Sequence, residues 1–385
     1  MMDDRARSGE GEAQESGPLE VRPDCFMVGY RNPAALLQCN TYLRSFHAGG
    51  APVHVCVDPG SRRDYPEVER HICELVEDVG EIHSFTLNHQ DPDVSGNAPL
   101  LCDANPNISG VMSEEVWRLV QHLDVRPKRL HFANTERSKW MTVGDRFRWQ
   151  VVPTPFCHFR GATAFYDPEL RTLFSGDLFG GFNRLGLVRL EAQEDDWLGV
   201  AQYHQIYMPS REALRYAVRQ IRALDPPVEV IAPQHGFVIT GDLVPLFLDR
   251  MDSLPVGLEL FTGQLDQSCL DRYREILQRV LEVADEVMGA EEVRRRLGDS
   301  EPRDNLPQFV SVRGETVRLE QQGYTAMALM FARLARGEPP EFANRLRDTI
   351  LQACAQAEVP VPPIGLGVAE GVAMDRVGSD GIRME

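Results

Sequence analysis

The stretch LNHQDPDVSG, residues 87–96, places one imidazole and two carboxylates on alternate residues. These are His89, Asp91 and Asp93, and the spacing suits neither a regular strand nor a helix. Three polar side chains converge on one point only when something holds them there, and a metal ion can do so. A mixed nitrogen and oxygen set suits iron, manganese or zinc. Taken alone, the triplet is more typical of a solvated turn, so other ligand-type residues are needed to support a metal site.

Two later stretches supply such residues. The segment TPFCHFRGATAFYDPELRTLFSGDLFGGF, residues 154–182, contains His158 and, nineteen residues later, the glycine-flanked Asp177. The segment IAPQHGF, residues 231–237, contains His235 immediately before a glycine. Six ligand-type residues are therefore available, and together they favour a metal site over a solvated turn.

Residues 21–255 alternate short β-type runs with amphipathic helical stretches, which indicates an α/β domain. Three of the runs end in a ligand-type residue, namely His89, Asp177 and His235. In open α/β sheets, binding sites gather at the carboxyl ends of the strands. The expected strands cover residues 53–58, 82–89, 148–155, 171–177 and 228–235, and the expected helices cover 66–80 and 212–224.

The pattern changes after residue 255. Helical periodicity continues over residues 268–289, 324–337 and 340–358, without strand-like runs between them. We therefore expect residues 256–385 to form a smaller all-helical domain that ends in a glycine-rich tail. Residues 1–20 are polar and acidic, which predicts a disordered tail.

The composition limits the function. A formal charge of −18 argues against binding to nucleic acid or to an anionic membrane, because both require a basic face. The eight cysteines form no CxxC pair, which is typical of reduced thiols and favours a cytoplasmic protein. We expect no signal peptide and no membrane span, because no apolar run has the required length.

With these motifs in place, the chain resembles the metallo-β-lactamase fold over roughly residues 25–255. That fold has an αββα sandwich and the ligand pattern HxHxDH, followed by a histidine, an aspartate and a last histidine. The segments NTYL (40–43), TPFCHF (154–159) and TLFSGDLFGGF (172–182) look more narrowly like its di-iron branch, which includes the flavodiiron proteins and oxygen-binding di-iron proteins. In that branch the second histidine of the pattern is replaced by an acidic residue.

The resemblance implies a complete ligand set. His89, Asp91 and His158 would bind one metal, Asp93 and His235 the other, and Asp177 would bridge them. This chain departs from the branch at two positions: Asp91 stands where the branch has a longer glutamate, and Val94 stands where the pattern continues with histidine. We expect no catalytic residue beyond the ligands, and no ligand role for the seven other histidines, which are His47, His54, His71, His83, His122, His131 and His204.

Two functions of different class remain open. The first is a non-haem di-iron protein that binds O2, either to sense it or to reduce O2 or NO with an external electron donor. No FMN is expected within the chain, because residues after 255 lack a strand followed by a phosphate-binding loop. The C-terminal helices would then contact a protein partner or a second copy of the chain.

The alternative is a binuclear zinc hydrolase of esters, thioesters or phosphodiesters. Asp91 and Val94 argue against it, since hydrolytic members keep histidine at both places. Two iron ions are the expected cofactor of the centre, and zinc or manganese is the alternative metal. A scaffold with a vestigial site is the third reading, and the coordinating chemistry retained at all six positions argues against it.

Overall fold

The computed structural model describes residues 17–47, 50–134, 139–144, 146–261, 267–298 and 305–365. Packing divides the chain into two compact units. The first contains the described residues up to Cys269 together with Cys354–Val361, and the second runs from Leu270 to Ala353 and includes the described residues from Pro362 onward. The predicted boundary after residue 255 stays a prediction. Among the described residues, no helix is both long enough and apolar enough to cross a membrane.

The first unit contains a seven-stranded sheet whose strands lie in the same order as they occur in the chain. The first four strands pair antiparallel, and the pairs from β4 to β7 are parallel. The parallel pairs place several strand ends at one edge, which is where binding sites are expected. The strands are β1 (Leu19–Arg22), β2 (Cys25–Met27), β3 (Tyr42–Phe46), β4 (Val53–Val57), β5 (Ile82–Thr86), β6 (Ser109–Met112) and β7 (Arg129–Phe132).

A second, six-stranded sheet follows in the order β13-β12-β11-β10-β9-β8. Its strands pair antiparallel except for β11 and β12, which are parallel. This exception brings the ends of β11 and β12 side by side. The strands are β8 (Trp140–Val143), β9 (Phe147–Pro153), β10 (Thr163–Asp167), β11 (Thr172–Gly176), β12 (Val230–Pro233) and β13 (Ile239–Thr240).

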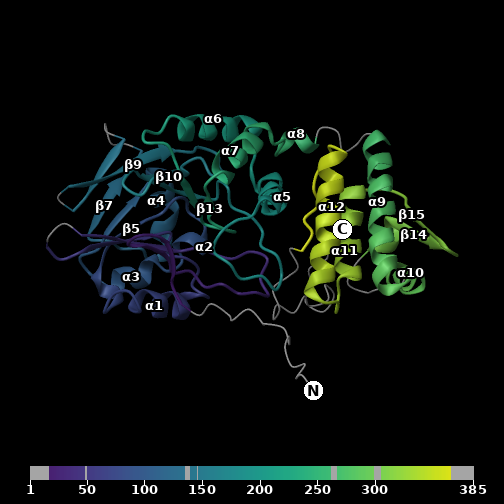
Figure 1. Ribbon diagram of the computed structural model, residues 1–385, viewed down its shortest axis with the longest axis horizontal. Helices are drawn as coiled ribbons and strands as arrows, with labels where there is room; N and C mark the ends of the chain where they lie inside the picture. Colours follow the sequence, from purple (N-terminus) through teal and green to yellow (C-terminus); the bar gives the residue numbers. More distant parts are fainter. Residues whose placement is uncertain are drawn as a thin grey trace, which may run out of the picture. The chain divides into compact units, whose positions relative to one another are not determined.

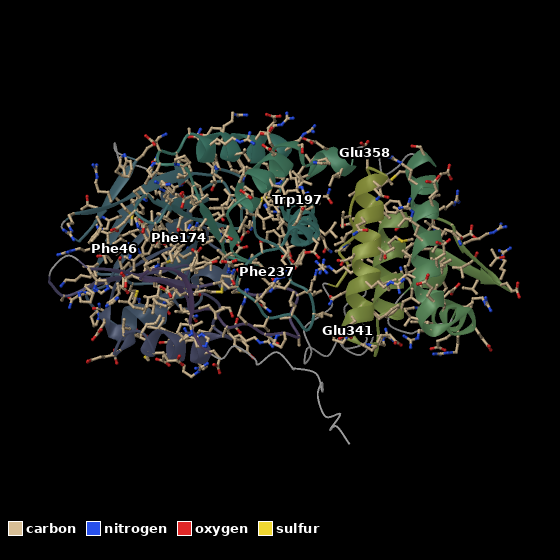
Figure 2. The ribbon with its side chains drawn as sticks, in the orientation of Figure 1. Phe46, Phe174, Trp197, Phe237, Glu341 and Glu358 are labelled. Atoms are coloured by element: carbon tan, nitrogen blue, oxygen red, sulfur yellow. The ribbon has the colours of Figure 1, made fainter. Side chains whose placement is uncertain are left out.

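The two sheets pack face to face around an apolar core. Phe46 and Val55 of the first sheet belong to the same buried cluster as Trp149 and Phe174 of the second, and Figure 2 shows Phe46 and Phe174 in this part of the molecule. Burial of one such large side chain stabilises the fold by about 1.5–3 kcal/mol. Alternation along the strands sends every second residue into this layer.

Helices cover the outer faces of both sheets (Figure 1). Helices α1 (Tyr65–Cys73), α3 (Ala98–Ala104) and α4 (Glu114–Val120) contribute to a buried cluster with β4 and β5. Helices α6 (Arg211–Arg222) and α7 (Leu243–Ser253) contact β9 and β13 of the second sheet. The predicted αββα sandwich is therefore confirmed. The remaining elements of this unit are η1 (Val79–Glu81), α2 (Pro92–Ser95), η2 (Gln121–Leu123), η3 (Glu194–Asp196), α5 (Trp197–Tyr207) and α8 (Leu258–Phe261).

The C-terminal region is helical, as predicted, but it also contains a hairpin of two strands. The strands β14 (Val310–Arg313) and β15 (Thr316–Leu319) pair antiparallel between helices α10 and α11, so the expectation that no strand would occur there was wrong. The other elements are α9 (Gln267–Met288), α10 (Ala290–Gly298), η4 (Leu306–Gln308), α11 (Gly323–Leu334) and α12 (Pro340–Gln356).

Both predicted tails lie largely outside the described residues. Residues 1–16 of the expected N-terminal tail are not among them, and Leu19 and Glu20 belong to β1 instead. The glycine-rich C-terminal tail is described only as far as residue 365. The disorder expected of residues 1–16 stays a prediction.

Candidate metal centre

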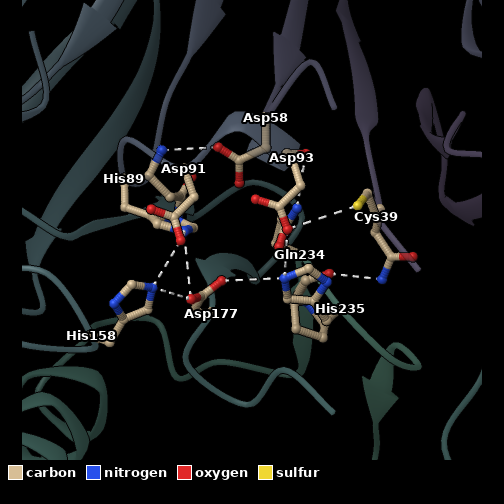
Figure 3. Close-up of polar contacts among 12 residues, drawn as sticks. Cys39, Asp58, His89, Asp91, Asp93, His158, Asp177, Gln234 and His235 are labelled. Carbon is tan, nitrogen blue, oxygen red and sulfur yellow. Dashed lines mark hydrogen bonds and ion pairs between the residues drawn. The ribbon is translucent and has the colours of Figure 1, made fainter. Parts of the chain in front are cut away.

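Loops that follow four strands bring the six candidate ligands together (Figure 3). His89, Asp91 and Asp93 follow β5, and His158 follows β9. Asp177 directly follows β11, and His235 comes two residues after β12. The positions expected from the sequence, at the ends of strands, are therefore those that the structure shows.

His89, Asp91 and His158 form the first cluster. Asp91 Oδ2 lies 3.2 Å from His158 Nε2 and 3.7 Å from His89 Nε2. One potential ligand atom from each residue lies within 4.8 Å of the others. The aspartate at position 91 therefore reaches the cluster in spite of being one methylene shorter than glutamate.

Asp93 and His235 form the second cluster together with Cys39, which was not predicted. Asp93 Oδ2 lies 3.4 Å from His235 Nε2 and 3.9 Å from Cys39 Sγ. The potential ligand atoms of these three residues also lie within 4.8 Å of one another. The side chain at position 94 does not contribute, because Val94 is fully buried in the apolar cluster beneath helices α1, α3 and α4.

Asp177 lies between the two clusters. Its Oδ2 is 3.4 Å from His89 Nε2 and 3.1 Å from His158 Nε2, whereas its Oδ1 is 3.6 Å from His235 Nε2. Each oxygen of one carboxylate thus faces a different cluster (Figure 3). This is the arrangement of a bridging carboxylate in a two-metal site.

The centre contains buried polar atoms without hydrogen-bond partners. Within the described part of the chain, neither oxygen of Asp177 and neither ring nitrogen of His89 forms a hydrogen bond of good geometry. Leaving a buried polar group unsatisfied costs about 1–3 kcal/mol, and more for a charged group. Cations coordinated by these atoms would remove that cost, and the imidazole and carboxylate donors suit iron, manganese or zinc. The residues present therefore fit a pair of such metals.

The carboxylates strongly perturb the histidines. Burial lowers the pKa of His89, but Asp177 and Asp91 outweigh it and raise that pKa to about 9. The carboxylates of Asp177 and Asp91, which lie 3.1 Å and 3.2 Å from His158 Nε2, raise the pKa of His158 to about 10. In the metal-free protein, protons on the imidazoles therefore balance the negative charge, and bound metal would take the place of those protons.

The six side chains are not equally exposed. His89, Asp177 and His235 are almost completely buried and form the floor of the centre. Asp91, Asp93 and His158 are partly exposed and form its rim. The exposed fractions of the side chains are 2% for His89, 1% for Asp177, 2% for His235, 35% for Asp91, 29% for Asp93 and 23% for His158.

Backbone hydrogen bonds fix the histidine after β12. His235 Nδ1 lies 2.8 Å from the carbonyl oxygen of Gln38. Because a carbonyl only accepts, Nδ1 carries the proton, and Nε2 is left as the nitrogen that faces Asp93 and Asp177. Asn40 holds the same loop by donating to the carbonyls of Pro233 and Gly236.

The loop after β5 is held in a similar way. Asn88 N donates to Asp58 Oδ1 at 2.9 Å, and Asn88 Nδ2 donates to the carbonyl of Phe174 at 2.9 Å. Gln234 Nε2 donates to the carbonyl of Asp93 at 3.1 Å. These bonds connect the ligand loops to strands of both sheets, so the ligands are positioned before any metal binds.

Helix α5 supplies an aromatic wall that sequence reasoning missed. The ring of Tyr203 lies 5.2 Å from that of His235, and the ring of Tyr207 lies 6.3 Å from that of His158. The two tyrosines are four residues apart and therefore lie on one face of the helix. The four-residue spacing of the two tyrosines is the sequence signal that could have revealed this wall. No ligand role is expected for His204 from the sequence. Its Nε2 accepts a hydrogen bond from Phe179 N at 3.0 Å, which fixes the turn after Asp177.

The part of the chain that matches a known protein family lies within the first compact unit. A family model described as ODP family beta lactamase matches residues 37–236, just over half of the 385 residues. The type A flavoprotein fprA of Rhodobacter capsulatus is 26% identical over 234 residues, which cover 58% of this chain and 53% of that protein. The chain thus spans about half the length of this relative.

Two solved structures are also similar. The chemotaxis sensor ODP, in a structure described as its peroxy diiron species, has a TM-score of 0.50 at 22% identity, covering 64% of this chain and 98% of that one. The flavodiiron protein from Giardia intestinalis has a TM-score of 0.55 at 16% identity, covering 71% of this chain and 68% of that one. These identities show a shared fold, and the resemblance to the metallo-β-lactamase fold and its di-iron branch is confirmed.

Proposed function

Because this chain belongs to the ODP family of beta lactamases, we propose that its six-ligand centre holds two iron ions and binds O2. One observation carries the proposal: the two oxygens of the buried Asp177 carboxylate face two separate ligand clusters. Among the described residues this carboxylate receives no hydrogen bond of good geometry on either oxygen, and its place between two sets of imidazole and carboxylate donors is best explained by a cation on each side.

The donor types favour iron over zinc. Each cluster combines an anionic carboxylate with imidazole, and the shared Asp177 adds further negative charge. Anionic oxygen donors stabilise the higher charge that iron acquires when it gives electrons to O2. When bound, two iron ions would supply those electrons, and the chain's own residues would set the charge, shape and access of the site.

The aromatic side chains limit access of water. Tyr203 and Phe182 are buried beside the second cluster, and their rings lie 5.4 Å apart. Tyr207 is exposed and lies next to His158. A small diatomic molecule would therefore approach from the rim, whereas the floor stays closed to solvent. This arrangement supports O2 as the ligand.

The chemotaxis sensor among the similar structures favours a sensing role for this chain. The helical C-terminal unit would then transmit the signal to a protein partner or a second copy. In a reductive role toward O2 or NO, an external donor would have to supply the electrons.

Metal content tests the proposal directly. The full chain is purified anaerobically from cells supplied with iron, zinc and manganese, and the three metals are measured by mass spectrometry. The reduced protein is then exposed to O2 while its visible spectrum is recorded. We expect two irons per chain and a new absorption band that depends on O2.

A matched pair of variants makes the test specific. Asp177→Asn should lose metal from both clusters, because it weakens the shared ligand. Asp167→Asn removes a carboxylate that is equally buried but pairs with Arg44. The folded fraction of this variant should retain both metals. Two zinc ions with no change on adding O2 would overturn the proposal in favour of a hydrolase, and a protein without bound metal would indicate a vestigial site.

A further inference from the structure

The two clusters offer unequal numbers of expected ligands. The first has His89, Asp91 and His158 in addition to the shared Asp177. The second has only Asp93 and His235 in addition to Asp177, because the valine at position 94 points into the core. A zinc ion in a protein takes four ligands, one of which is a water in catalytic sites, so the expected ligands leave one coordination position of the second cluster unfilled.

Cys39 lies where that donor is missing. Its sulfur is 3.9 Å from Asp93 Oδ2 and belongs to the same compact group of potential ligand atoms as His235 (Figure 3). The contact with Asp93 is at the long limit of a hydrogen bond to sulfur, so it accounts poorly for the position of the thiol.

The backbone on both sides of Cys39 is tied to the loop that carries His235. Gln38 accepts the hydrogen bond from His235 Nδ1, and Asn40 N donates to the carbonyl of Gln234 at 2.6 Å. The thiol is thus held beside the imidazole by two short connections. Such pre-organisation is what a ligand position requires, because the cost of ordering the side chain is already met.

A second, independent feature points to a cation at the same place. Asp177 Oδ1 faces the second cluster, is buried, and receives no hydrogen bond of good geometry within the described part of the chain. Sulfur, imidazole nitrogen and two carboxylate oxygens therefore surround one small volume. Anionic and neutral donors gathered in this way are suited to a metal ion.

We propose that the Cys39 thiolate is the fourth protein ligand of the second metal, in the place of the imidazole that Val94 cannot supply. The inference rests on the proposed two-metal function. On binding, the thiol releases its proton to solvent as the sulfur–metal bond forms, and no electron is transferred. The centre would then be asymmetric, with only nitrogen and oxygen donors around the first metal and a softer, sulfur-containing set around the second.

X-ray absorption spectroscopy of the full chain loaded with zinc tests this inference. We expect a zinc–sulfur shell at about 2.3 Å. Because only the second metal would have a sulfur ligand, its amplitude should correspond to one sulfur for every two zinc ions in the sample. Cobalt-loaded protein should in addition show a near-ultraviolet thiolate-to-cobalt band. Neither readout depends on activity, and both use the unaltered protein, so they hold even where a variant fails to fold.

Two variants assign the sulfur. Cys39→Ser should remove the shell and the band, and should weaken binding of the second metal at least tenfold while the first stays bound. Cys102→Ser, at a buried cysteine of α3, should change neither. Two bound metals without a sulfur shell would overturn this inference and leave the proposed function intact. Failure to bind any metal would overturn the proposed function as well.

Discussion

Raising the pH from 6.5 to 9 should destabilise the metal-free protein and leave the stability of the metal-loaded one unchanged. In the folded metal-free state the pKa of His89 is raised from 6.5 to about 9, by Asp177 and Asp91 acting against burial. A raised pKa means that the folded state holds the proton more tightly than the unfolded state. The stabilisation is therefore complete below pH 6.5 and is lost as the pH rises through about 9.

The size of this effect follows from the same values. Each pH unit between 6.5 and about 9 removes ~1.4 kcal/mol for the proton on His89, about 3 kcal/mol in all. His158, whose pKa is raised to about 10, changes in the same direction. Metal ions displace these protons, so above pH 6.5 neither the folded loaded protein nor the unfolded chain holds the extra imidazole proton, and the stability of the loaded protein should stay constant over the same interval.

Urea unfolding measured by tryptophan fluorescence provides the assay. The four tryptophans are Trp117, Trp140, Trp149 and Trp197, and all belong to the first compact unit. The free energy of unfolding is determined between pH 6 and pH 9.5 with chelator and with excess zinc.

His89→Gln should flatten the profile of the metal-free protein, and His122→Gln, at an exposed position in η2, should leave it unchanged. A metal-free protein whose stability is constant from pH 6.5 to pH 9 would refute the reasoning.

Three further predictions follow from the glycines and from metal removal. Gly176 has a φ of 61°, and an added Cβ would lie 2.7 Å from Asn88 Cβ, so Gly176→Ala should cost about 1–3 kcal/mol and reduce metal uptake. Gly241→Ala, at a φ of 58° with open space around it, should cost less in urea unfolding and leave metal uptake unchanged. Gly323→Ala should destabilise the C-terminal unit in thermal unfolding without changing metal content, because its Cβ would clash with the Tyr273 ring; loss of metal would contradict this. Removing metal with a chelator should lower the free energy of unfolding of the first unit. The expected loss is about 3 kcal/mol for each site, if the free metal concentration before removal was 100 times the Kd of that site. An unchanged unfolding transition would count against a folded two-metal centre.

Local patterns predicted much of the framework. The strands that end near His89, Asp177 and His235 have clear β-type runs, and turns that follow strands are where polar side chains can gather. Such reasoning works because each of these residues is fixed by its own strand. It could not show that the loops from β5, β9, β11 and β12 meet, since that depends on how two sheets pack.

The features that were missed depend on long-range contacts or on a signal that was overlooked. Cys39 is 54 residues from Asp93 along the chain, and its place in the second cluster results from hydrogen bonds to the loop around His235. No local pattern contains that information. The hairpin of β14 and β15 was predictable, because alternating valines flank a turn with Gly314 at a φ of 60°.

The difference between floor and rim has a kinetic consequence. Among the six described ligand side chains, Asp91, Asp93 and His158 are the ones exposed to solvent, so metal ions, chelators and small ligands should reach the centre past them. Metal ions and small ligands therefore enter and leave the centre by the same route. A small molecule bound between these three side chains would slow the dissociation of the metal ions behind it, so ligand binding should lengthen the lifetime of the metal-loaded protein.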